Sequence, residues 1–324
     1  MPRIRITPEK LYAEISDAAG KLNAGRATLE AAKDAELGSC ARREVFRIDN
    51  VVLYHYHVRT VVNNPVPVLI VYALVNRPDM ADLQSDRSLI RSLLDRGLDV
   101  YLIDWGYPNG ADRALTLEDY ICRYVDGAVD FVCEAAHQTQ VNLFGICQGG
   151  TFSVCYSALN PTKVRNLIAT VTPIDFHTPN DMLSHLFRHV DVDLLVDSSG
   201  NISGGMLNMI FLSLKPFRLA QQKYVHMVDG LDDLEATRMF MRMEKWIFDS
   251  PALAGAAFRE FAIGFYQKNN LIKGAVTIGD RRVDLKQVRM PVLNIYASND
   301  HLVPPEASLA LGEQAFDAYT GLLN

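Results

Sequence analysis

Short apolar runs alternate with segments of helical spacing along the first half of the chain. Four runs are continuously apolar and are expected to be strands buried on both faces, at Val66–Tyr72, Val100–Asp104, Val141–Phe144 and Asn166–Thr172. The segments between them are predicted to be helices, at Ser88–Arg96, from Thr116 to about Ala136, and from the turn at Gly149 to Leu159. Such alternation predicts an α/β fold class with a mostly parallel central sheet and helices on both faces.

The residues before this pattern contain other elements. Glu44–Asp49 and Val51–Val58 alternate apolar with polar residues and predict two strands. Thr7 followed by Pro8 is typical of a helix start, and a helix to about Glu30 is expected to be a surface or partner-binding helix.

The alternation stops over the region 175–284, where Met, Phe and Trp recur at helical spacing around an irregular polar piece, Asp197–Gly205. This region is predicted to be an inserted, mainly helical cap. The sheet resumes at Met290–Ala297. We therefore expect an N-terminal helical segment (1–40), the first part of the core (41–174), the cap (175–284) and the second part of the core (285–324), apparently truncated at its C-terminus.

Composition and charge exclude several classes of protein. The chain of 324 residues is 49% apolar and 22% charged, as is usual for a globular protein. Its net charge of −6 argues against a nucleic-acid partner. We find no apolar run near the length of about 20 residues that spans a bilayer and no secretory signal, so the expected location is cytoplasmic.

Five cysteines without a CxxC pair indicate free thiols rather than disulfides or structural zinc. No metal or cofactor is expected. One of the five has a distinctive context, because Gly145-Ile146-Cys147-Gln148-Gly149-Gly150 follows an apolar strand and precedes a helix. In a nucleophile elbow of this kind, small residues two positions either side let strand and helix approach.

Cys147 is the predicted nucleophile of this elbow. The N-terminus of the following helix is expected to lower the thiol pKa. A cysteine, where most elbows have a serine, suggests a thioester substrate. The alternative is a buried structural cysteine, the commonest role of a free Cys and the one expected for the remaining helical cysteines.

The other members of a catalytic set are sought along the chain. Asp300 follows the strand Met290–Ala297 and is the predicted acid, whereas Asp104 is expected to brace the turn after its strand. The backbone N–H groups of Gln148 and Val75 are the predicted oxyanion-hole donors. Among the 24 residues after Asp300 (301–324), His301 is the one histidine, and it is predicted either to support the catalytic residues or to act as a substitute base.

These residues resemble the polyhydroxyalkanoate synthase family of the α/β-hydrolase superfamily, and most of all its class III catalytic subunit. The resemblance runs from about Lys10 to Pro305. It rests on the blocks Leu69–Pro78, Asp99–Pro108, Ala111–Tyr120, Asn142–Gly150, Phe211–Phe217, Arg242–Pro251 and Asp300–Pro305.

The resemblance implies that Cys147 is acylated, that Asp300 is the catalytic aspartate, and that Gln148 and Val75 donate to the oxyanion. It implies (R)-3-hydroxyacyl-CoA, chiefly 3-hydroxybutyryl-CoA, as substrate and a polyester stored in granules as product. It further implies a non-catalytic partner subunit and a homodimer or hetero-oligomer.

The chain departs from the family pattern after Asp300. Members continue to a Gly-His-Ile-Gly segment that supplies the catalytic histidine, whereas Glu306–Asn324 contains none. The simpler account is truncation, and activity of this chain then depends on the missing base. Two alternatives stay open: an inactive truncated paralogue that binds without turnover, and an acyl-CoA thioesterase of the same fold.

Overall fold

The computed structural model describes residues 7–33, 35–214, 222–314 and 318–323. The last three residues of the block Phe211–Phe217 lie outside this part. An eight-stranded sheet organises the chain, in the order β1-β2-β6-β3-β7-β8-β11-β12. Its strands are β1 (Arg42–Ile48), β2 (Val51–Tyr56), β3 (Val68–Val71), β6 (Val100–Asp104), β7 (Val141–Ile146), β8 (Val164–Thr170), β11 (Val292–Ala297) and β12 (Ala318–Leu323).

The strand directions place the site. β2 is antiparallel to both β1 and β6, whereas the pairs from β6 to β12 are parallel. The carboxyl ends of the parallel strands therefore lie along one edge, which is where open α/β sheets bind ligands. Two two-stranded ladders lie outside the sheet and pair β4 (Asp82–Gln84) with β5 (Arg87–Ser88) and β9 (Thr277–Ile278) with β10 (Arg281–Arg282).

Helices connect the strands. The α-helices are α1 (Pro8–Ala32), α2 (Leu89–Leu94), α3 (Asp126–Ala135), α4 (Gln148–Leu159), α5 (Met182–Phe187), α6 (Val192–Ser199), α7 (Gly204–Leu214), α8 (Lys223–Asp229), α9 (Leu234–Phe248), α10 (Gly255–Phe261) and α11 (Pro305–Gln314). Shorter helical turns are η1 (Pro78–Ala81), η2 (Gly110–Ala114), η4 (Pro161–Lys163) and η7 (Leu285–Gln287), and two π-helical segments are η3 (Asp119–Val125) and η6 (Ala262–Gln267).

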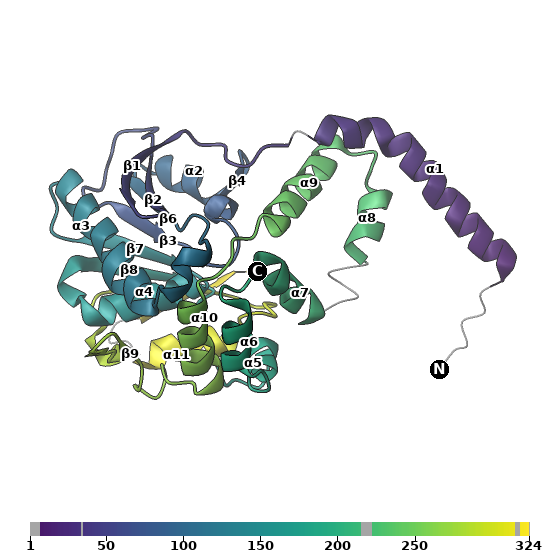
Figure 1. The fold of residues 1–324 in the computed structure, drawn as a ribbon. Coiled ribbons are helices and arrows are strands. Elements are labelled where there is room, and N and C mark those ends of the chain that lie inside the picture. Colours follow the sequence, from purple (N-terminus) through teal and green to yellow (C-terminus); the bar gives the residue numbers. More distant parts are fainter. Residues whose placement is uncertain (1–6, 34, 215–221, 315–317, 324) are drawn as a thin grey trace. The chain divides into compact units, whose positions relative to one another are not determined.

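The core lies on both faces of the sheet. Val68 and Ile70 of β3 pack on one face with Ile90 and Leu94 of α2. α4 packs against β7, β8 and β3, and α11 against β11 and β12 (Figure 1). The predicted α/β class, with a mostly parallel sheet and helices on both faces, is confirmed.

The chain divides into two compact units. The helical unit comprises Met1–Leu37 and Asn208–Phe248, and the sheet unit comprises Gly38–Leu207 and Asp249–Asn324. Within the helical unit α1 packs against α8 and α9, and Gly25 of α1 lies against the Leu231 side chain. The predicted division of the chain, with a cap over 175–284, stays a prediction.

Local sequence signals explain several element ends. Thr7 caps α1, and its side chain accepts a hydrogen bond from Lys10 N–H at 3.3 Å. Thr116 and Asp119 bond to each other's backbone and form a capping box, which fits the helix start predicted at Thr116. The polar piece Asp197–Gly205 was expected to be irregular, but α6 continues to Ser199 and α7 begins at Gly204.

Candidate active site

Cys147 stands at the corner between β7 and α4. Its backbone has φ 54° and ψ −125°, a left-handed conformation that is strained for any residue with a Cβ. Neighbouring backbone holds it there, because Cys147 N–H donates to Thr170 C=O at 2.9 Å and Cys147 C=O accepts from Gly150 N–H at 2.9 Å. The side chain of Cys147 is half-buried. The strand–corner–helix geometry predicted from the motif is therefore present.

The glycines of the motif let the helix approach the sheet closely. A Cβ on Gly145 would crowd Gly150 Cα and lie 2.7 Å from Ser153 Oγ. A Cβ on Gly149 would meet the backbone carbonyls of Val71 and Tyr72 at the end of β3. Glycine is needed at both positions because backbone atoms, which cannot rotate away, fill the space.

The thiol of Cys147 is neutral at physiological pH. Burial raises the pKa of Cys147 to about 11; a hydrogen bond from Gln148 N–H opposes this shift and the charge of Asp300 adds to it. The helix N-terminus therefore lowers this pKa as expected, but the loss of hydration outweighs it and the net shift is upward. A base must remove the proton before or during nucleophilic attack.

Asp300 lies beyond the end of β11, within electrostatic reach of the Cys147 sulfur. Its Oδ1 accepts hydrogen bonds from the N–H groups of Leu302 at 2.8 Å and Val303 at 3.0 Å. These bonds fix the carboxylate at the turn that leads into α11. The structure thus brings together Cys147 and Asp300, although 153 positions separate them in the sequence (300 − 147).

The oxyanion loop, defined as residues 73–77, connects β3 to η1. It contains Val75 and runs beside the start of α4, where the Gln148 side chain accepts a hydrogen bond from Leu74 N–H at 3.2 Å. The two predicted donors, Val75 and Gln148, therefore belong to neighbouring segments. Their role as backbone donors to an oxyanion stays a prediction.

Three histidines of the sheet unit lie in different parts of it. His301 is half-buried next to Asp300, and its role as a base or supporting residue stays a prediction. His55 is paired with Asp99 at 2.7 Å, at the amino end of β6 and so at the opposite edge of the sheet from Cys147. His177 bonds through Nε2 to the Tyr266 carbonyl at 3.0 Å.

Two phenols share the surroundings of the thiol. Burial raises the pKa of both Tyr72 and Tyr266, and the electrostatic influence of Cys147 raises them further. Tyr266 stacks on Phe187 with ring centroids 5.1 Å apart. Two aromatic side chains thus lie within electrostatic reach of the sulfur.

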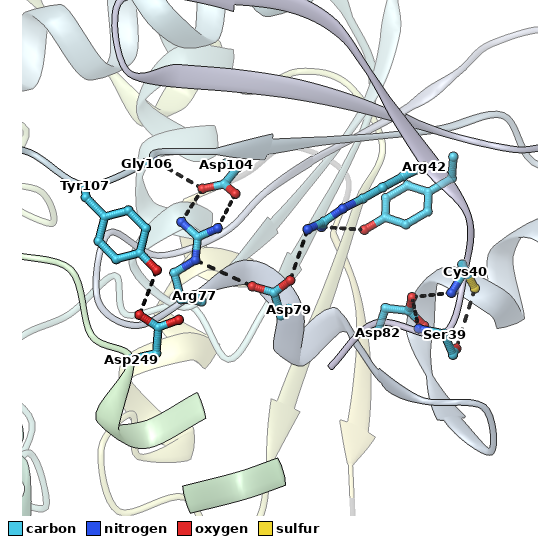
Figure 2. Close-up of polar contacts among 11 residues, drawn as sticks. Ser39, Cys40, Arg42, Arg77, Asp79, Asp82, Asp104, Gly106, Tyr107 and Asp249 are labelled. Carbon is cyan, nitrogen blue, oxygen red and sulfur yellow. Dashed lines mark hydrogen bonds and ion pairs between the residues drawn. The ribbon is translucent and has the colours of Figure 1, made fainter. Parts of the chain in front are cut away.

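A buried charge network, which the sequence reasoning missed, lies behind the oxyanion loop (Figure 2). Arg77 forms a bidentate ion pair with Asp104, with one N–O distance of 2.6 Å, and also approaches Asp79 at 3.5 Å. Asp79 in turn binds Arg42 at 3.2 Å. Asp104 accepts a bond from Gly106 N–H at 3.0 Å, so the expectation that it braces this turn is confirmed.

Metal binding and membrane insertion were also considered. Within the described residues, no group of three or more His, Cys, Asp or Glu side chains is arranged to hold a metal ion. The helices in the same part of the chain are all too short or too polar to cross a membrane.

Comparisons with known proteins agree with this architecture. The alpha/beta hydrolase fold family matches residues 66–321. The chain is 54% identical to the poly(3-hydroxyalkanoate) polymerase subunit PhaC of Thiocystis violacea, covering 99% of this chain and 91% of that protein. It is 55% identical to PhaC of Allochromatium vinosum, covering 95% and 87%, and 52% identical to PhaC of a Synechocystis strain, covering 86% and 76%. The chain therefore belongs to the poly(3-hydroxyalkanoate) polymerase PhaC family, within the α/β-hydrolase fold.

Proposed function

We propose that this chain is an acyltransferase that polymerises (R)-3-hydroxyacyl-CoA, chiefly 3-hydroxybutyryl-CoA, into polyhydroxyalkanoate and releases coenzyme A. The relatives named above, poly(3-hydroxyalkanoate) polymerase subunits at 52–55% identity, support the reaction class. One observation supports the chemistry most directly. Cys147 occupies the strained corner between β7 and α4, where the charge of Asp300 acts on its sulfur.

The first half-reaction acylates Cys147. Asp300, directly or through a histidine, accepts the thiol proton, and the sulfur attacks the thioester carbonyl to form a new C–S bond. The backbone N–H groups of Gln148 and Val75 stabilise the oxyanion of the tetrahedral intermediate. The intermediate collapses by breaking the C–S bond to coenzyme A, which leaves with the proton. His301 is a second candidate for the proton carrier.

The second half-reaction lengthens the polyester. The hydroxyl oxygen of one 3-hydroxyacyl unit attacks the acyl carbonyl of another, forming an ester C–O bond. The base accepts the hydroxyl proton, and the C–S bond of the attacked thioester breaks. Each added unit thus forms one ester and releases one molecule of coenzyme A as free thiol.

Replacing Cys147 with Ala tests the nucleophile. Release of coenzyme A from 3-hydroxybutyryl-CoA should fall by roughly a thousandfold or more, because no covalent intermediate can form. The matched control is Cys155→Ala, since Cys155 is fully buried within α4. Turnover by Cys147→Ala at the rate of the unmodified chain would rule the proposal out.

The products separate this function from its rivals. A polymerase yields polyester and coenzyme A, whereas a thioesterase yields free 3-hydroxybutyric acid. A non-catalytic paralogue would bind the thioester without acylating Cys147, which mass spectrometry of the intact chain detects. Recovery of free acid in amounts matching released coenzyme A would replace polymerase with thioesterase.

The predicted cap (175–284) is part of this proposal. It would cover the acylated thiol and move to let the polymer leave. Limited proteolysis before and after acylation tests the idea, because a cap should become protected in the acylated form. An unchanged cleavage pattern would count against a cap.

The partner and location are proposed from the family. The word subunit in the names of the relatives supports a non-catalytic partner subunit, and a growing apolar polyester supports association with storage granules. Co-expression with that subunit should raise polymer yield and shift the sedimentation of the chain. An unchanged yield and an unchanged sedimentation coefficient would contradict the partner.

A further inference from the structure

We infer that Arg77 and Asp104 form a positioning pair that fixes the oxyanion loop for acylation of Cys147. This inference rests on the proposed function, since it concerns the same thiol and the same oxyanion. Neither residue touches the reacting atoms in this account. They act by holding the backbone that carries Val75.

The geometry of the pair favours positioning over general stabilisation. The two side chains are 12% and 4% exposed, and the guanidinium meets the carboxylate through two parallel N–H···O bonds. Burial lowers the pKa of Arg77, but Asp104 and the other acidic neighbours raise it above its ordinary value, so the guanidinium stays charged. A buried ion pair is a weak source of net stability, whereas its bidentate geometry fixes direction and distance.

The loop needs such a fixing element. Asn76, between Val75 and Arg77, has φ 61°, a left-handed conformation that costs energy in a residue other than glycine. Strained backbone of this kind persists only where its surroundings hold it. Arg77 is the next residue, and its ion pair to the end of β6 keeps the chain from relaxing.

Three contacts from two other segments hold the loop along its length, and Figure 2 shows the one between Asp104 and Arg77. Trp105 Nε1 donates to Tyr72 C=O at 2.9 Å, where the loop begins. The Gln148 side chain accepts from Leu74 N–H at 3.2 Å, and Asp104 binds Arg77, where the loop ends. Val75 lies between the second and third contacts. Asp104 and Trp105 are consecutive, so the end of β6 contacts the loop at both its beginning and its end.

Tyr107 closes the arrangement on the other side of the guanidinium. Its ring lies 4.8 Å from Arg77 Cζ, and its hydroxyl donates to Asp249 Oδ1 at 2.7 Å. The Arg77 side chain is thus held by charge on one side and by an aromatic face on another. A lysine offers one point charge and cannot reproduce the two parallel bonds.

The test compares two reactions of the same sulfur. Acylation by 3-hydroxybutyryl-CoA or by p-nitrophenyl butyrate forms an oxyanion, whereas alkylation by iodoacetamide forms none. In Arg77→Lys, Arg77→Met and Asp104→Asn, acylation should slow roughly tenfold to a hundredfold, because a displaced donor loses much of its effect. Alkylation should stay within about twofold, because it needs no oxyanion donor. The loss should appear in kcat and not in KM.

Controls separate positioning from damage to the fold. Asp82→Asn removes another buried carboxylate, one that binds Ser39 and Cys40 away from the loop, and its two rates should change together or not at all. The double variant Arg77→Met with Asp104→Asn should lose no more than either single variant. If Met and Asn variants fail to fold, Arg77→Lys keeps the charge and still reports the ratio of the two rates.

Equal loss of acylation and alkylation in folded variants would overturn the positioning pair, as would additive losses in the double variant. If the unmodified chain reacts with the activated ester but not with the CoA thioester, the proposed polymerase function fails while the pair is still tested. If neither acyl donor reacts with the unmodified chain, both are overturned.

Discussion

Cys147 carries a neutral thiol, so its reactions should depend steeply on pH. With a pKa of about 11, the thiolate fraction rises throughout the range from pH 7 to 10. Alkylation by iodoacetamide followed against pH should therefore increase without a plateau below about pH 10. A plateau near pH 7 would show that the thiol is ionised and would contradict the burial effect described above.

Asp300 should influence this titration in a direction that its charge dictates. A nearby anion disfavours thiolate, so Asp300 raises the pKa of Cys147. Asp300→Asn should then lower the pH at which alkylation becomes rapid, while acylation should slow because the proposed base is removed. Asp130→Asn, which removes a carboxylate paired with Lys163, is the control and should leave the alkylation profile unchanged. An upward move of the profile in Asp300→Asn would contradict the placement of the two residues.

The strained backbone of Cys147 should lower the free energy of unfolding, so a variant without the strain should be more stable although it is inactive. Glycine adopts φ 54° without strain, whereas alanine keeps the strain and loses only the sulfur. Cys147→Gly should therefore exceed Cys147→Ala in free energy of unfolding by about 1 kcal/mol, while both are inactive. Urea unfolding compares them. Equal stabilities would show that the surrounding structure relaxes around the corner.

At the scale of elements, α4 and β3 approach so closely that adding one methyl group between them should push them apart. Gly149→Ala would place a Cβ against the carbonyls of Val71 and Tyr72. The free energy of unfolding should fall by about 2 kcal/mol or more, because backbone must shift. Gly264→Ala, where no atom lies within 4 Å of the added Cβ, should change stability little. Urea unfolding of both variants checks this, and equal effects would contradict the close approach.

Most elements of the sheet could be predicted from their apolar runs, because strands buried on both faces have a simple pattern. β6 has the predicted bounds, and β7, β8 and β11 lie within two residues of theirs at the carboxyl end. β12 was missed. A six-residue edge strand near the end of the sequence gives too short a signal to separate it from a tail. α6 runs from Val192 to Ser199 and so extends into the piece Asp197–Gly205 that was expected to be irregular. Asp191 caps its start, and Gly200, with φ 70°, ends it.

Residues of the candidate site could be proposed from the sequence only where a contiguous motif or an obvious strand marks them. The elbow is a contiguous motif, and Asp300 follows an obvious strand, so both could be located. The Arg77–Asp104 pair could not, because 27 positions separate its members and strand order alone brings them together. The net upward shift in the pKa of Cys147 was missed for a related reason. Helix ends can be read from sequence, whereas burial of a single sulfur depends on side chains from several distant segments.

At the scale of the whole molecule, the segment Asn208–Phe248 leaves and rejoins the sheet unit at adjacent points. Ile202 N–H donates to Leu253 C=O at 3.0 Å and Leu253 N–H donates to Ile202 C=O at 2.8 Å, with both side chains buried. Gly204 lies against the backbone of Ser250. Because the departing and returning chains are paired, the sheet unit does not depend on the intervening residues to bring them together.

Joining residues 38–207 to 249–324 through a short Gly-Ser linker should therefore give a folded protein. The sheet and its buried core lie in the retained residues, so cooperative thermal unfolding should persist and iodoacetamide should still label Cys147. Near-ultraviolet circular dichroism and labelling stoichiometry provide the measurements. A product without fixed tertiary signals would show that the helical unit is needed for folding.

The backbone pairing of Ile202 with Leu253 also affects how the sequence can change during evolution. Insertions and deletions between these two residues lengthen or shorten the segment Asn208–Phe248, and they should shift no strand of the sheet out of register. Evolution can therefore change the segment Asn208–Phe248 to suit a new partner or surface. Cys147 and Asp300 belong to the sheet unit and need not change with it.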